Sequence, residues 1–120
     1  MEVAHELVAG CRDGRVDENL DKIYAVDAVS VEAGGFTDST ERARHGLDAI
    51  REKHAWFDSA YETLEQEVSA PYPHGSDRFA VVFTVKMRNR ETDETSNTSE
   101  VAIYYVSDGK ITREEFFYAV

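Results

Sequence analysis

The last twenty residues, 101–120, constrain the fold most strongly, because they read as two long strands joined by a tight turn. The pair Asp108-Gly109 favours a two-residue hairpin turn, in which both central residues adopt positive φ. Runs rich in Val, Ile, Tyr and Phe flank this pair, and these residues suit the pleated surface of a sheet. Neither face of residues 101–106 is polar, so we expect this strand to be central and covered on both sides.

The second strand of this hairpin alternates so that Arg113 and Glu115 share a face with Ile111 and Phe117. Two interpretations remain open. In the first, the charged residues form a solvated pair on the sheet surface. In the second, one of them lines a pocket.

The rest of the chain predicts helices before strands. Apolar residues at helical spacing predict helices over about residues 2–12, 16–24 and 46–60. Alternating patterns predict strands over 28–33, 61–70 and 79–88, with a short strand as a further candidate at 40–43 and a polar hairpin loop at 90–97. This order is typical of an α+β fold with helices on one face of an antiparallel sheet. The length supports a single domain, residues 1–120, with its own core.

Composition excludes several classes of partner and site. The net charge of −11 argues against nucleic acid and membranes, since both are bound chiefly through Lys and Arg. The single cysteine, Cys11, lies on an apolar helical stripe, where we expect it to pack as a small hydrophobe. The four histidines show no metal-ligand spacing, so we expect no metal site; they are His5, His45, His54 and His74. No motif indicates a cofactor. No leader-like or membrane-spanning run is visible, and we expect a cytoplasmic protein.

Several stretches, in this order, resemble the SnoaL-like branch of the NTF2-like superfamily along nearly the whole chain. They are LDKIYAVDAVSVE (20–32), GLDAIREK (46–53), DRFAVVF (77–83) and GKITREEFFY (109–118). The resemblance implies an α+β cone, in which a curved antiparallel sheet wraps around the helices and encloses a pocket. It also implies a homodimer formed through the outer face of the sheet. Members include isomerases, cyclases and dehydratases as well as proteins that only bind, so the fold does not fix a reaction.

Isomerases of this superfamily suggest where catalytic groups would lie. They place a carboxylate base at the end of the first strand, a Tyr on the first helix and a second acid on a late strand. Here Leu7 and Val8 stand where the Tyr would be sought, so that hydrogen-bond donor is missing. Glu100 is the counterpart considered for the late acid, although a register shift of one residue would turn it to the other face.

This sequence can be aligned with the family in two ways at the position of the base, and these place either Glu32 or Ala33 in the pocket. The alternation of Val29, Val31 and Ala33 favours Ala33, because the apolar face of a strand should point inward. Glu32 therefore remains a weak catalytic candidate. His54, on the apolar stripe of the third helix, is the other.

The pocket is expected to be largely aromatic. The candidates for its lining are Tyr24, Trp56, Phe57, Phe79, Phe83, Tyr104, Glu115 and Phe117, with Tyr72 as a further aromatic. The leading hypothesis is a protein that binds a small hydrophobic molecule in this pocket. The alternatives are an isomerase, cyclase or dehydratase that uses a pocket carboxylate, and a dimeric interaction module whose cavity is filled by side chains.

Overall fold

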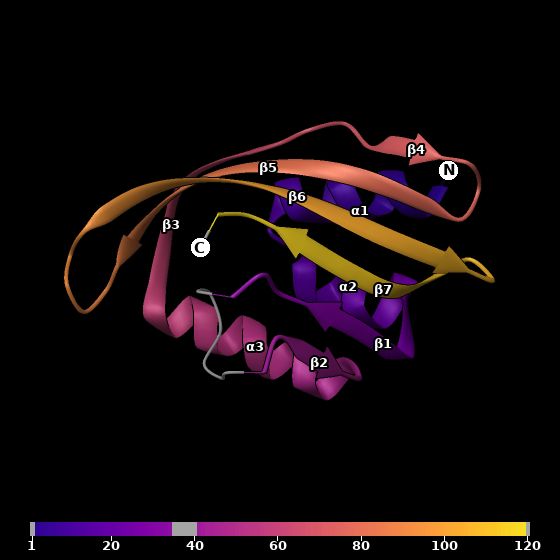
Figure 1. Ribbon diagram of the computed structural model, residues 1–120, viewed down its shortest axis with the longest axis horizontal. Coiled ribbons are helices and arrows are strands. Elements are labelled where there is room, and N and C mark those ends of the chain that lie inside the picture. The colour runs from indigo at the N-terminus through magenta and orange to yellow at the C-terminus, as the bar shows by residue number, and fades with distance from the viewer. Residues whose placement is uncertain (1, 35–40, 120) are drawn as a thin grey trace.

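The computed structural model describes residues 2–34 and 41–119, which form three helices and seven strands (Figure 1). The helices are α1 (Glu2–Asp13), α2 (Val16–Ile23) and α3 (Leu47–Ala60). The strands are β1 (Tyr24–Val31), β2 (Ala43–His45), β3 (Tyr61–Val68), β4 (Tyr72–His74), β5 (Arg78–Asn89), β6 (Thr95–Ser107) and β7 (Lys110–Phe117). The helices of these residues are too short or too polar to cross a membrane.

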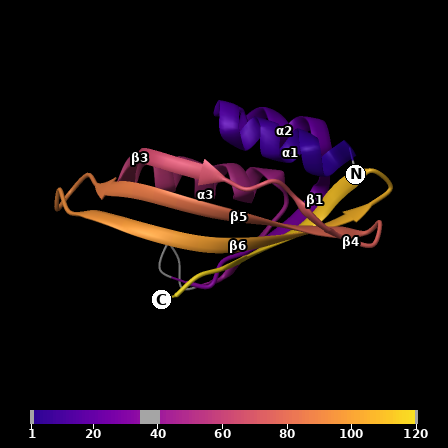
Figure 2. The same cartoon turned by 90° about the horizontal axis from the view of Figure 1, so that it is seen from above.

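The strands form one curved sheet in the order β2-β1-β7-β6-β5-β3, with β4 paired to the end of β5. Figure 2 shows α1 and α2 on one side of the long strands β5 and β6. The predicted α+β class is therefore confirmed. One strand pair differs from the expected antiparallel sheet, because β1 and β7 run parallel. Parallel neighbours require a long connection, and here all the other strands lie between them in the chain.

The predicted hairpin at the end of the chain is present. Asp108 and Gly109 have φ values of 51° and 74°, as a turn with positive φ at both central residues requires. The strands on either side pair from Ser107 with Lys110 to Val101 with Phe117. The other hairpin loop is shorter than expected, since β5 continues to Asn89 and β6 begins at Thr95.

A β-bulge at Thr112 reverses the faces of β7. Tyr105 pairs with Arg113 and Val106 pairs with Ile111, which leaves Thr112 without a partner on β6. As a result Ile111 and Glu114 both point inward and are buried. The expectation that Ile111 shares a face with Arg113 and Phe117 is therefore wrong, because an extra residue shifts the two-residue period.

The inward face of β1 also differs from the expected one. Ala28 and Ser30 are fully buried and Glu32 is only 8% exposed, whereas Val29, Val31 and Ala33 are only partly buried. The preference for Ala33 over Glu32 as the inward residue is thus wrong. The apolar alternation was misleading because polar groups fill the inward face here, each satisfied by a buried partner.

The core lies where α1 and α2 cover the sheet. Leu7, Val8 and Leu20 from the helices join buried side chains of the strands, including Phe79 and Tyr104, whose rings stack at 5.0 Å. The two helices approach each other closely at Gly10, which lies beside the buried side chain of Asn19.

We expect Gly10→Ala to destabilise the protein by about 1–3 kcal/mol, a typical cost of overpacking. A Cβ at this position would clash with Nδ2 of Asn19 and lie 2.8 Å from its Cγ. Urea unfolding measures the effect. In a protein that already carries Asn19→Ala, the Gly10→Ala substitution should cost less stability than it does in the wild type, because the clashing amide is gone. A Gly10→Ala protein as stable as the wild type would contradict this close approach.

Candidate functional site

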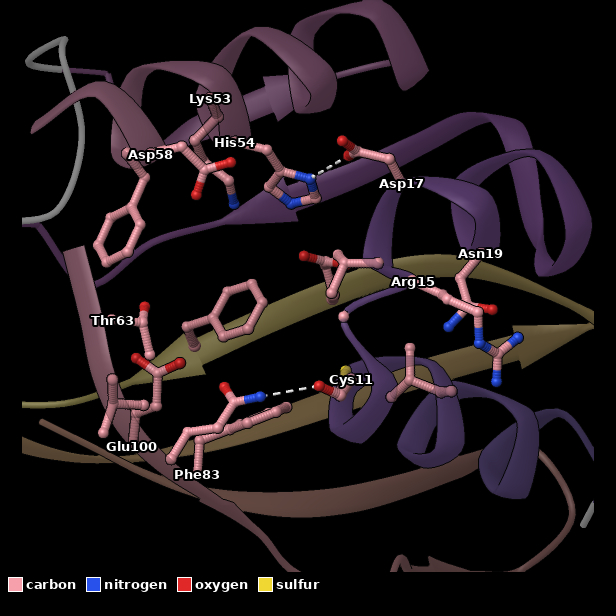
Figure 3. Close-up of a pocket in the computed structure, with 18 of the residues that line it drawn as sticks. Cys11, Arg15, Asp17, Asn19, Lys53, His54, Asp58, Thr63, Phe83 and Glu100 are labelled. Atoms are coloured by element: carbon pink, nitrogen blue, oxygen red, sulfur yellow. Dashed lines mark hydrogen bonds and ion pairs between the residues drawn. The ribbon is translucent and has the colours of Figure 1, made fainter. Parts of the chain in front are cut away.

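A cavity of about 610 Å³ lies between the helices and the concave side of the sheet (Figure 3). Much of its wall is apolar or aromatic, from Leu7, Phe57, Phe83, Val85, Met87, Tyr104 and Phe116. The charged side chains that join the inner wall are Glu32, Lys53, Glu100 and Glu114. The exposed residues Asp17, Glu18 and Asp58 also line it and mark where it opens to solvent.

Glu114 anchors one end of a buried polar network. Its Oε2 accepts a hydrogen bond from Ser30 Oγ at 2.9 Å, and its Oε1 accepts one from the hydroxyl of Tyr24. Ser30 and Glu114 are neighbours in the β1–β7 ladder, so the parallel pairing brings them together. Burial and the nearby charge of Glu114 raise the pKa of Tyr24 well above its ordinary value, which keeps this hydroxyl neutral and able to donate.

Lys53 joins this network to Glu32. Its Nζ donates to Ser30 Oγ at 2.5 Å and to Glu32 Oε1 at 2.7 Å, and it stands 4.9 Å from the centroid of the Phe116 ring. The other oxygen of Glu32 accepts a hydrogen bond from the Tyr118 hydroxyl at 2.8 Å. The carboxylates of Glu32 and Glu114 therefore have both oxygens occupied, and the ammonium of Lys53 is surrounded by its own partners.

Glu100 differs from Glu32 and Glu114. It pairs with Phe83 across the β5–β6 ladder, and among the described residues no donor forms a hydrogen bond or ion pair with its carboxylate. Burial raises its pKa to about 7, and the charges of Glu32 and Glu114 add to this effect while Lys53 opposes it. Glu100 can therefore gain and lose a proton near neutral pH.

Two further groups of the wall have clear chemical limits. Burial raises the pKa of Cys11 to about 12, so its thiol remains protonated and is not a nucleophile. His54 places Nδ1 3.1 Å from Asp17 Oδ1, which links α3 to α2 beside the cavity (Figure 3). Within the described ranges, no three His, Cys, Asp or Glu side chains are grouped to hold a metal ion.

The structure brings together only part of the predicted site. Both catalytic candidates, Glu32 and His54, line the cavity, and so do four of the proposed lining residues: Tyr24, Phe57, Phe83 and Tyr104. Phe79 is instead enclosed in the core, and Trp56 packs edge-on against Tyr61.

The remaining lining candidates were placed wrongly by the sequence pattern. Phe117 is 54% exposed, and Glu115 forms an ion pair with Arg113 at 3.5 Å. Both residues follow the bulge at Thr112, which turns them to the outer face of the sheet. Tyr72 is 60% exposed on the edge strand β4.

Sequence reasoning missed Glu114, Ser30 and Lys53. One signal was available for Lys53, since it follows Ile50 by three residues and so falls on the apolar stripe of α3. A lysine on such a stripe indicates either a solvated end or a buried partner. No comparable signal marks Glu114, because its orientation depends on the bulge.

The family model of the SnoaL-like domain matches residues 1–118. The chain belongs to the SnoaL-like family. Among solved structures, a Mesorhizobium loti protein provisionally assigned as a SnoaL-like polyketide cyclase is 32% identical, with a TM-score of 0.88 over 98% of this chain and 97% of that one. No curated protein matches this SnoaL-like chain.

Two more distant structures share the fold of this SnoaL-like protein. TerC, crystallised with polyporic acid, is 22% identical, with a TM-score of 0.75 over 98% of this chain and 89% of TerC. An NTF2-like protein of unknown function from Burkholderia pseudomallei is 14% identical, with a TM-score of 0.77 over 99% of this chain and 89% of that one.

We expect Lys53→Met to destabilise the SnoaL-like domain by about 3–5 kcal/mol, because it leaves the buried carboxylate of Glu32 without a cation. Adding Glu32→Gln should recover part of this loss. Lys22→Met is the matched control, since Lys22 pairs with Glu6 at the surface and should cost about 1 kcal/mol or less. Chemical unfolding measures all three proteins. Equal losses for Lys53→Met and Lys22→Met would contradict the buried ion pair.

Proposed function

We propose that the protein binds a small, largely apolar carbonyl compound in the cavity and transfers a proton on it, with Glu100 as the acid–base group. One observation carries this proposal: a carboxyl group with a pKa of about 7 stands on the wall of an apolar cavity without a hydrogen-bonding partner among the described residues. General acids and bases work best when their pKa lies near the operating pH. Glu100 meets that requirement.

The other acids are less suited to this role. Each oxygen of Glu32 and Glu114 already accepts a hydrogen bond, so a substrate would have to displace Lys53, Ser30 or a tyrosine hydroxyl. As a carboxylate, Glu100 takes a proton from the carbon next to the carbonyl group; as an acid, it returns one. The rings of Phe57 and Phe83 favour a flat or cyclic molecule.

The comparisons support this class of ligand. The Mesorhizobium loti relative is provisionally assigned as a cyclase, and cyclisation of carbonyl compounds involves proton transfer at carbon. TerC was crystallised with polyporic acid, which supports a small organic molecule as the type of ligand. The cavity volume also disfavours an interaction module with a filled interior.

A binding protein without catalysis is the second candidate. Leu7 and Val8 stand where isomerases carry a helical tyrosine, and Leu7 lines the cavity. Such a site can still bind the ligand, but it lacks one of the hydrogen-bond donors that would stabilise the developing oxyanion. The fate of the proton on carbon separates the two candidates.

We expect the wild type to accelerate exchange of the α-hydrogens of 2-tetralone, a bicyclic ketone, with D2O, as followed by NMR. Glu100→Gln should slow the catalysed exchange by about 100-fold or more, the typical contribution of a general base. Glu94→Gln, in the β5–β6 turn, is the matched control and should exchange at the wild-type rate. The rate should rise as the pH is raised through about 7, because the base is ionised above its pKa. Equal catalysis by Glu100→Gln would exclude this role.

We further propose that the outer face of the sheet pairs with a second copy of the chain. Val101 and Phe117, which face each other in the β6–β7 ladder, are 38% and 54% exposed. Partly buried Val82 continues this apolar strip on β5, beside Val101. Such a strip on a highly charged chain is better explained by a covered surface than by exposure to water.

Light scattering should therefore give about twice the 13.5 kDa chain mass at micromolar concentration. Phe117→Arg should shift the protein toward the monomer, because it places a charge on the contact. Val26→Arg, at a hydrophobic position that is 79% exposed and away from this strip, should remain dimeric. A wild-type mass near 13.5 kDa would refute the dimer.

A further inference from the structure

Among the described residues, two side-chain contacts link α3 to α2, and one of them lies at the cavity. His54 pairs with Asp17, and both residues line the cavity. Arg51 pairs with Asp21, and neither of these residues lines it.

The contact with Asp17 fixes which nitrogen of His54 keeps a proton. Asp17 faces Nδ1 at 3.1 Å, and an ionised carboxylate can only accept a hydrogen bond. Nδ1 therefore carries hydrogen in both the neutral and the protonated ring. Nε2, on the other side of the ring, is the nitrogen that does not face Asp17. Figure 3 shows His54 with one nitrogen directed at Asp17 and the second turned away from it, while Glu100 stands across the cavity beside Phe83.

Proton abstraction by Glu100 creates a need for a donor near the substrate's carbonyl oxygen. When a C–H bond next to a carbonyl breaks, negative charge develops on the carbonyl oxygen and must be neutralised by a donor. The hydroxyls of Tyr24 and Ser30 already donate to Glu114, and Lys53 donates to Ser30 and Glu32. His54 stands on the wall opposite Glu100 and has a nitrogen that is free of this network.

We propose that His54 is a second catalytic residue, which protonates the substrate's carbonyl oxygen through Nε2, and that Asp17 is its positioning residue. This inference rests on the proposed function. Glu100 gains the carbon's proton, the C–H electron pair becomes the C=C bond of an enol, and the carbonyl π electrons take the Nε2 proton. His54 is left neutral, with its Nδ1 hydrogen still bonded to Asp17. The reverse steps return both protons.

The direct test measures the tautomer of His54 by ¹⁵N NMR on the whole protein, and it needs no substrate. In the wild type above neutral pH, Nδ1 should carry the hydrogen, and Asp17→Asn should shift the population toward the form protonated at Nε2, which is the usual one in water. Asp21→Asn, which breaks the other helix–helix pair, should leave the tautomer unchanged. A wild-type His54 protonated mainly at Nε2 would overturn the inference.

Exchange of 2-tetralone in D2O supplies the second readout. His54→Asn, which keeps an amide near the Nδ1 position but has nothing at Nε2, should slow exchange by about 100-fold. Asp17→Asn should slow it by at least about tenfold, and Asp21→Asn should not change it. If His54→Asn and Asp17→Asn exchange like the wild type while Glu100→Gln is inactive, the role of His54 is refuted and the proposed function stands. If Glu100→Gln also retains activity, the proposed function fails, and with it this inference.

Discussion

The ammonium group of Lys53, held between Ser30 and Glu32, is the interaction on which the interior of this protein depends. It places one positive charge among three carboxylates in a space that is otherwise largely apolar. Buried ion pairs of this kind contribute little net stability, because desolvation offsets their attraction, but loss of one partner is costly. The Lys53–Glu32 pair therefore requires α3 to lie against the end of β1, so that Lys53 reaches both Ser30 and Glu32.

The sheet determines which acids face this charge. The bulge at Thr112 turns Glu114 inward, and the parallel pairing of β1 with β7 then sets Ser30 beside it. The ladder between β5 and β6 places Glu100 next to Phe83, where no donor of the described residues forms a hydrogen bond with it. Two acids are thus fixed by hydrogen bonds, whereas the third is left to titrate. The division of roles follows from the register of the strands and not from the identity of the residues, since all three are glutamates.

The sequence allowed the architecture to be predicted well, because its signals are local or periodic. The Asp108-Gly109 turn, the helical stripes and the long alternating strand before Asn89 each specify an element without knowledge of the others. The site was predicted less well for the opposite reason. Its geometry depends on a bulge that leaves no mark in the sequence and on contacts between residues far apart in the chain, such as Ser30 and Glu114. The apolar-inward rule failed at β1 because Ser30 and Glu32 are buried with partners that the local pattern cannot reveal.

The central claim is that Glu100 is a carboxyl group kept in its neutral form up to about neutral pH by its surroundings. NMR titration of the Glu100 side-chain carboxyl carbon tests this directly, with assignment by comparison with Glu100→Gln. The account predicts a midpoint near pH 7, because burial and the charges of Glu32 and Glu114 disfavour the ionised form. A midpoint near the ordinary value of 4.5 would show that the carboxyl group is solvated, and would contradict both the shape of the cavity wall and the function built on it.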